Sequence, residues 1–82
     1  METAVAFGKV LRKLRLESGL TQEQLGLEAD LRRTYISVLE LGQQQPSLTT
    51  ILKLAGALSI SGADLLRMVE AELARERRRA RR

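Results

Sequence analysis

Two chemically versatile residues are missing from this 82-residue chain, which contains neither cysteine nor histidine. Without cysteine there is no disulfide and no thiolate metal site. Without histidine, the commonest general base and the commonest transition-metal ligand are absent. The carboxylates show no spacing typical of a metal site or of a nucleophile and its base. We therefore predict that the chain is not an enzyme and uses neither a metal nor another cofactor.

The sequence also lacks the features that direct a chain into or across a membrane. No apolar run approaches the length of a membrane span, and the N-terminus does not have the pattern of a signal peptide. Eighty-two residues correspond to one domain with a small core. We expect a soluble cytoplasmic protein with no membrane partner.

Positive charge is scarce outside the C-terminal end, although the whole chain has a net charge of +4. Residues 1–74 contain eight Lys and Arg against nine Asp and Glu, whereas residues 75–82 contain six Arg and one Glu. The high pI is therefore weak evidence for a DNA-binding surface on the body of the protein. We predict one domain at 1–74 and a basic tail at 75–82, which is either a fraying helix end or disordered.

Helix breakers are few: the only proline is Pro46, and glycines fall at plausible breaks such as Gly19 and Gly42. Thr21 and Gln24 match a capping box at the start of a helix. Apolar spacing predicts an all-α fold with helices at about 3–17, 21–29, 32–41, 48–58 and from 61 or 62 onward. The predicted core consists of the apolar stripes of these helices and the plugs of two turns: Phe7, Val10, Leu11, Leu14, Leu25, Ala29, Leu31, Ile36, Leu39, Leu48, Ile51, Leu52, Ala55, Leu58, Ile60, Leu65, Leu66, Val69 and Leu73.

The most informative stretch is 20–46, where a short helix, a tight turn and a second short helix follow one another. This arrangement commonly places the second helix in the major groove of DNA. Four side chains of that helix share a face that points away from the core: Arg33, Thr34, Ser37 and Val38. Arginine can bind guanine through two hydrogen bonds, hydroxyls can serve several bases, and valine can contact a thymine methyl. An ordinary solvated helix face would show the same pattern.

Residues 7–66 resemble the XRE family of helix-turn-helix domains, which is the phage-repressor and Cro type. The residues that carry the resemblance are Arg15, 20–25 (Leu-Thr-Gln-Glu-Gln-Leu), Leu31, Ile36, Ser37, 40–42 (Glu-Leu-Gly), 46–48 (Pro-Ser-Leu) and Leu58. The stretch 32–37, together with Glu40 and 46–48, is particularly similar to the controller proteins of restriction–modification systems. The resemblance implies a compact five-helix bundle with a lambda-repressor-like DNA-binding domain, from a bacterium or phage, that binds DNA as a dimer.

The resemblance also implies contacts to the DNA backbone. Gln22 matches a family glutamine that meets a phosphate, and a helix N-terminus offers free N–H groups to such an anion. A simple helix-start residue is the alternative. Arg32 is expected to reach a phosphate or a base, and Tyr35 to place its hydroxyl near the backbone or simply to be half-buried. Gln43 and Gln44 can donate hydrogen bonds to phosphates but neutralise no charge.

A structural ion pair is implied between Arg15 and Glu40, which would join the first helix to the end of the third. A surface ion pair of little energetic value is the alternative. Three features depart from the family. Gly26 replaces the usual alanine and weakens a helix while permitting close approach. Leu41 replaces a polar residue, and glutamines at 43–45 replace a loop that is often basic, so the domain should show a shallow salt dependence.

A homodimer is expected because several apolar residues exceed what a small monomer buries. The fifth helix is the predicted seam, through Leu65, Leu66, Met68 and Val69, with burial in the monomer core as the alternative. A twofold dimer would place two recognition helices about 34 Å apart, which is one turn of DNA.

The sequence therefore predicts a transcriptional regulator that binds a palindromic operator as a homodimer, with a recognition helix at about 32–41. Its partners would be double-stranded DNA and a second copy of the chain, and contact with RNA polymerase is compatible with this role. A protein-interaction module on the same fold, antitoxin-like or an adaptor, is the alternative, favoured by the near-neutral body and by Leu41.

Overall fold

The computed structural model describes residues 2–81, and within this range the chain forms five α-helices and no strand. The helices are α1 (Thr3–Glu17), α2 (Gln22–Ala29), α3 (Arg33–Glu40), α4 (Leu48–Ala57) and α5 (Gly62–Ala80). Their order and starting points agree with the apolar spacing, so the predicted all-α fold is confirmed. Met1 and Arg82, the outer ends of the predicted domain and tail, lie outside the described residues.

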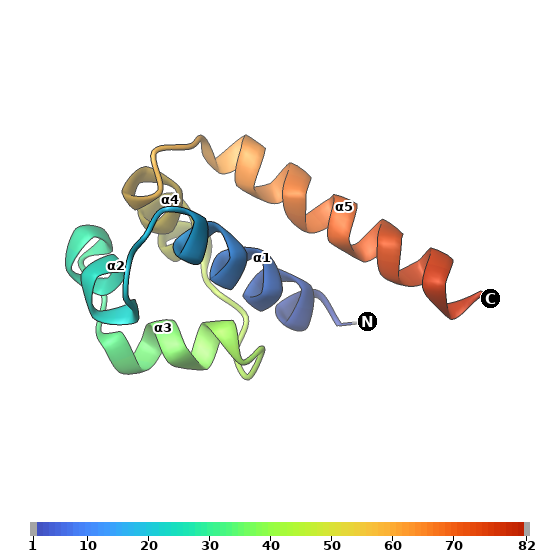
Figure 1. The fold of residues 1–82 in the computed structure, drawn as a ribbon, viewed down its shortest axis with the longest axis horizontal. Coiled ribbons are helices and arrows are strands. Elements are labelled where there is room, and N and C mark those ends of the chain that lie inside the picture. The colour runs from blue at the N-terminus through green and yellow to red at the C-terminus, as the bar shows by residue number, and fades with distance from the viewer. Residues whose placement is uncertain (1, 82) are drawn as a thin grey trace.

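Helix α1 lies in the middle of the bundle, with α3 against one side of it and α5 against the other (Figure 1). Helices α2 and α3 pack on each other, and α4 bridges α2 and α5. The described N-terminal and C-terminal ends lie at the same end of the molecule, and α5 runs past the end of the bundle (Figure 1). This arrangement leaves the outer side of α3 uncovered by the other helices.

The predicted capping box at the start of α2 is present. The Thr21 hydroxyl accepts a hydrogen bond from the Gln24 backbone N–H at 3.0 Å, and the Gln24 side-chain oxygen accepts one from the Thr21 N–H at 2.9 Å. At its other end α2 stops at Asp30, which adopts a left-handed conformation with φ 57°. The capping box starts α2 and the left-handed Asp30 ends it, so together they fix the length of α2 and the direction in which α3 begins.

Gly26 has a steric reason to be glycine. A Cβ at this position would lie 2.6 Å from the carbonyl oxygen of Leu31, which belongs to the turn between α2 and α3. The backbone N–H of Leu31 also bonds to the Gly26 carbonyl at 2.8 Å. The close approach that glycine permits therefore makes the turn tight, and it offsets the weaker helix propensity.

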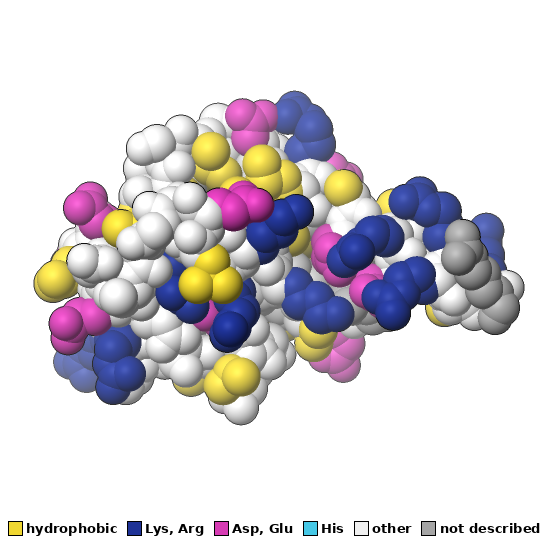
Figure 2. Space-filling view, in the orientation of Figure 1, with side chains coloured by type: hydrophobic (Ala, Val, Ile, Leu, Met, Phe, Trp, Pro, Cys, Tyr) yellow, Lys and Arg dark blue, Asp and Glu magenta, His cyan; other side chains and the backbone are white. Residues whose placement is uncertain are grey.

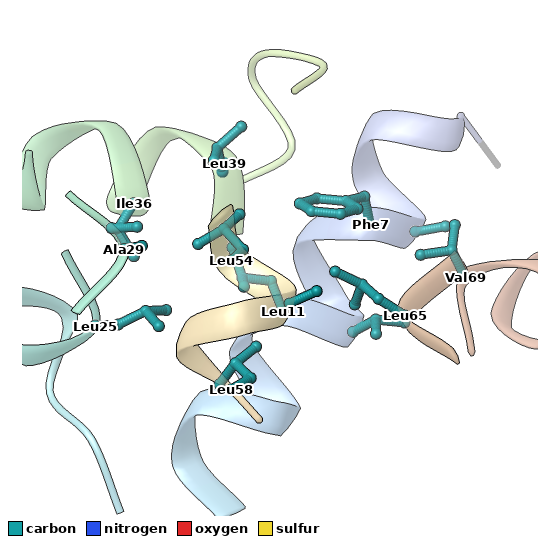
Figure 3. Packing of buried hydrophobic residues seen from close by; sticks show 13 residues of the cluster. Phe7, Leu11, Leu25, Ala29, Ile36, Leu39, Leu54, Leu58, Leu65 and Val69 are labelled. Atoms are coloured by element: carbon teal, nitrogen blue, oxygen red, sulfur yellow. The ribbon is translucent and has the colours of Figure 1, made fainter. Parts of the chain in front are cut away.

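All five helices contribute fully buried side chains to one core (Figure 3). The largest of these side chains are Leu11, Leu25, Ile36, Leu39, Leu54 and Leu65. Because two of them come from α3, this helix is anchored by apolar burial on its inner side. At about 25 cal/mol per Å² of apolar surface, this burial is the main force that holds α3 in place.

The structure corrects the predicted core at three leucines. Leu48, Leu52 and Leu66 are 67%, 55% and 41% exposed, whereas Leu54, which was not among the predicted core residues, is fully buried. Helix α4 is apolar on nearly every side, so its sequence fits more than one stripe. The orientation of α4 is set by its neighbours α2 and α5, and this information is not in its own pattern.

Helix α5 passes through the predicted domain boundary at 74/75 without a break and ends at Ala80. Intrahelical ion pairs join Glu72 to Arg75 at 2.8 Å and Glu76 to Arg79 at 3.3 Å, and Lys9 of α1 lies 3.7 Å from Glu76. Each exposed pair adds only a few tenths of a kcal/mol, but together they favour the helix. Residues 75–80 are therefore helical, and of the two predicted states of the tail the structure has the helical one.

Candidate nucleic-acid interface

The four predicted base-facing residues lie on one outer side of α3. Arg33 and Thr34 are exposed, Ser37 and Val38 are half-buried, and the opposite side of the helix carries the fully buried Ile36 and Leu39. In the described structure, Arg33 takes part in none of the ion pairs. The helix therefore presents a guanidinium, two hydroxyls and a small apolar group to the solvent, and these groups match the donors and methyl contacts of the major groove.

A buried ion pair attaches the end of α3 to α1. Arg15 donates from Nε to Glu40 Oε2 at 2.6 Å and from Nη2 to Glu40 Oε1 at 3.0 Å, and its Nη1 donates to the Leu20 carbonyl at 2.9 Å. The two side chains are 8% and 3% exposed. Hydrogen bonding to Glu40 raises the pKa of Arg15 above its ordinary value, against the opposing effect of burial. The structure thus brings together the two residues that the family resemblance paired.

Gln22 joins the same network. Its Nε2 donates to Glu40 Oε1 at 3.1 Å, so the first residue of α2 is connected to the last residue of α3. Gln22 also lines a shallow hollow between the two helix N-termini, together with Arg15, Thr21, Glu23 and Arg33. The predicted phosphate contact of Gln22 would use the remaining amide hydrogen or the free backbone N–H groups of the first turn.

Gly8, which the sequence analysis did not single out, determines how closely α3 approaches α1. A Cβ at this position would lie 2.7 Å from the Glu40 carbonyl oxygen and would also clash with the carbonyl of Leu39. A glycine in the middle of an otherwise regular amphipathic helix costs about 1 kcal/mol. Gly8 lies seven residues before Arg15 and therefore on the same face of α1. An unfavourable glycine on the face that carries Arg15 was the signal that could have identified Gly8 as a contact point for α3.

The predicted backbone contacts surround this face. Arg32 is the exposed N-cap residue of α3, and Gln43 and Gln44 are exposed in the loop after it. Tyr35 is half-buried and packs against the core. Arg32 precedes α3 and Gln43 and Gln44 follow it, whereas Tyr35 lies in its first turn.

Comparison with known proteins agrees with this geometry. The family model described as helix-turn-helix matches residues 11–65, which is more than half of the chain. The chain belongs to the helix-turn-helix family. It is 46% identical over 61 residues to the control protein C.BamHI of Bacillus amyloliquefaciens, covering 73% of this chain and 75% of that protein.

Solved controller proteins of this helix-turn-helix family have the same fold. The restriction–modification controller C.AhdI from Aeromonas hydrophila is 47% identical, with a TM-score of 0.73 over 76% of this chain and 94% of that one. The controller C.Esp1396I, solved as a tetramer in complex with its natural 35-base-pair operator, is 28% identical with a TM-score of 0.82 over 90% of this chain and 97% of that one. The predicted similarity to controller proteins is confirmed.

Two of the four residues of the predicted dimer interface on α5 are buried in the single chain. Leu65 and Val69 are 0% and 4% exposed in the single chain, so they have no surface left to bury against a second copy. Leu66 and Met68 are exposed, but residues two apart lie roughly 200° apart around a helix and cannot share one face. Leu66 instead lies one turn after Gly62, whose position is in close contact with Leu52 of α4.

Residues 2–81 hold no cluster typical of a metal site, because within this range no three acidic side chains come close enough together to bind an ion. No single helix in the same range is long and apolar enough to cross a membrane, although α4 and α5 taken together, bent by 103°, would pass by length and composition.

Proposed function

We propose that this helix-turn-helix protein is a transcriptional regulator that binds a palindromic operator, with α3 in the major groove. The observation that carries the proposal is the division of α3 into a buried side, with Ile36 and Leu39, and an outer side that exposes Arg33 and Thr34. A groove-reading helix needs both, because the inner side fixes its direction and the outer side contacts base edges.

In this proposal Arg33, Thr34, Ser37 and Val38 read bases. Arg33 is the strongest candidate, because its guanidinium can donate two hydrogen bonds to the O6 and N7 atoms of guanine. Gln22, Arg32, Tyr35, Gln43 and Gln44 would contact phosphates at the two ends of α3, which fixes the register of the protein on DNA without reading sequence.

A homodimer is part of the proposal. We place its interface on the outer side of α4 and the start of α5, which retains Leu66 of the predicted interface. Leu48 and Leu52 are one turn apart on α4 and more than half exposed. Gly62 at the start of α5 lies close to Leu52, and Leu66, one turn further along α5, is 41% exposed. Three leucines on adjoining helices form an apolar surface that a second copy can cover. Two copies related by a twofold axis would read two half-sites about 34 Å apart.

Regulation would follow from occupancy of the operator in the cytoplasm. A site that overlaps a promoter would block RNA polymerase, and a site beside a promoter would allow contact with it. The near-neutral body supports a modest salt dependence of binding, since few phosphates would be neutralised.

Selection of bound duplexes from a random DNA pool tests the proposal. We expect an enriched palindrome whose half-sites are one helical turn apart, because two recognition helices bind by the same contacts. Enrichment of a single half-site would remove the dimer from the proposal. No enrichment at physiological salt would favour the alternative, a protein-interaction module on this fold.

A further inference from the structure

The structure contains a groove between α1 and α5 that the proposed contact with DNA does not use. Its volume is about 590 Å³. The apolar groups that line it are Val10 and Leu14 from α1 and Met68 and Ala71 from α5. Met68 has an apolar side chain, yet this residue is 38% exposed to solvent. The groove is therefore an apolar strip that the single chain leaves partly open.

The rim of the groove is cationic. Lys9 and Lys13 line it from α1, and Arg75 and Arg78 line it from α5, against two carboxylates, Glu17 and Glu72. Glu72 is already paired with Arg75 at 2.8 Å. In the described part of the chain, Lys13 and Arg78 take part in no ion pair. In the space-filling view, Lys and Arg side chains gather over this part of the surface with a smaller number of Asp and Glu side chains between them (Figure 2).

The groove lies on the side of α1 that faces away from α3. Helix α3 contacts α1 through Gly8 and Arg15, which share one side of the helix. Lys9 and Lys13, on the rim of the groove, lie roughly on the opposite side at 100° per residue. An occupant of the groove would therefore leave the base-facing side of α3 free.

The shape and charge of the groove select among occupants. A strip between two adjacent helices accommodates a third helix, whose apolar side chains would fill the floor. From Met68 to Arg78 the groove spans about 15 Å, which is the length of roughly three helical turns. Among the rim groups without an ion pair in residues 2–81, the two cations Lys13 and Arg78 outnumber the one carboxylate, Glu17, so carboxylates on the flanks of that helix would complement the excess positive charge.

Two other occupants fit less well. In a twofold contact through this groove, a second copy would bring its own arginine-rich α5 or the lysines of its α1 toward the same cations, which is unfavourable. A nucleic acid backbone would be attracted by the rim, but it has no apolar groups to cover Val10, Leu14 and Met68.

We propose that the groove between α1 and α5 docks a helical segment of a partner protein, with an apolar stripe on one side and carboxylates along its flanks. This contact goes beyond the proposed operator binding and does not depend on it. Lys13 and Arg78 bind the carboxylates, and Met68 packs under the stripe. The protein can then hold DNA on one side of α1 and an acidic partner on the other.

Two labelled helical peptides of about 14 residues test the proposal by fluorescence anisotropy with the full chain. Both carry Leu at i, i+3, i+4 and i+7, and they differ only in having Glu or Lys on the flanks. We expect the Glu peptide to bind and the Lys peptide to bind at least about tenfold more weakly. Binding of the Glu peptide should weaken as salt rises from about 0.1 M to about 0.5 M.

Two groove variants and one matched control locate the contact. Lys13→Glu should weaken binding of the Glu peptide by about tenfold or more, and Met68→Glu should abolish it. Lys53→Glu on α4 makes the same charge change outside the groove and should leave binding unchanged. Circular dichroism melts of each variant show that the exposed substitutions leave the fold intact.

Several results would overturn the proposal. The proposal fails if neither peptide binds or if both peptides bind equally well. It also fails if Lys13→Glu and Lys53→Glu weaken binding of the Glu peptide to the same extent. Weaker binding of a random duplex by Lys13→Glu would assign the groove to nucleic acid. A change of oligomeric state in Met68→Glu would assign it to a second copy. Since the peptide assay contains no operator, these results leave the test of DNA recognition untouched.

Discussion

Arg15 and Glu40 meet side by side in the interior of the protein, through two N–H to carboxylate hydrogen bonds of 2.6 and 3.0 Å. Glu40 is the last residue of α3, and Arg15 lies in the last turn of α1. The pair therefore controls the direction in which the recognition helix projects from the bundle. Because both charges are almost fully shielded from water, each depends on the other for stabilisation.

Replacing Glu40 with alanine should destabilise the fold strongly. The Arg15 guanidinium would stay buried without its partner, which costs about 3–5 kcal/mol. Urea denaturation measures the change in the free energy of unfolding. Arg67→Ala is the matched control, because it breaks an ion pair with Asp64 whose side chains are 71% and 52% exposed, and it should cost about 0–1 kcal/mol. A similar small loss in both variants would contradict a structural role for the buried pair.

Gly8→Ala should also destabilise the protein, by about 1–3 kcal/mol, because the new methyl group would collide with the backbone of α3. Gly56→Ala offers the opposite case within one chain. Gly56 is exposed in α4 and a Cβ there meets nothing within 4 Å, so alanine should stabilise by about 0.5–1 kcal/mol. Thermal melts of the two variants should shift in opposite directions. Stabilisation by Gly8→Ala would show that α3 can move away from α1 at no cost.

Leu52→Glu should dissociate the proposed homodimer without unfolding the chain, since Leu52 is 55% exposed in the single chain. Sedimentation analysis should show a monomer for this variant. Leu27→Glu, at a leucine 79% exposed on α2, should remain a dimer. If Leu52→Glu sediments as wild type does, the surface formed by Leu48, Leu52 and Leu66 is not the interface.

Removing residues 75–82 should leave the salt dependence of operator binding nearly unchanged. The arginines of α5 lie on the opposite side of α1 from α3, so they are expected to neutralise no phosphates (Figure 1). The slope of log K against log salt becomes shallower by about 0.9 for each phosphate that the protein no longer neutralises. The loss of even one phosphate contact in the shortened chain would therefore be detected. A clear reduction of the slope in the shortened chain would show that the tail binds DNA.

Local signals in the sequence were sufficient for much of the fold. The capping box of Thr21 and Gln24 and the stop at Gly19 depend on residues close together in the chain, and they placed α1 and α2 correctly. The division of α3 also followed from its spacing, because Ile36 and Leu39 are its strongly apolar residues on one side.

Features that depend on contacts between distant elements were not predictable in this way. The orientation of α4, which exposes Leu52 and buries Leu54, is set by the helices around it. The hydrogen bond from Gln22 to Glu40 and the steric need for Gly8 both require knowing where α3 lies. The course of α5 beyond residue 74 is a different case, because the ion pairs Glu72–Arg75 and Glu76–Arg79 are local and join residues three apart. Their spacing was visible in the sequence, whereas composition alone did not distinguish the segment from a disordered basic tail.

The most direct test of groove reading compares wild type and Arg33→Ala on the selected operator and on every single-base variant of it. We expect wild type to lose about 1–3 kcal/mol when one guanine is replaced, and Arg33→Ala to lose that preference while keeping the others. Gln22→Ala should instead weaken binding to all the duplexes alike. If Arg33→Ala lowers the affinity for every duplex equally and the guanine preference persists, Arg33 does not read a base and the assignment of α3 fails.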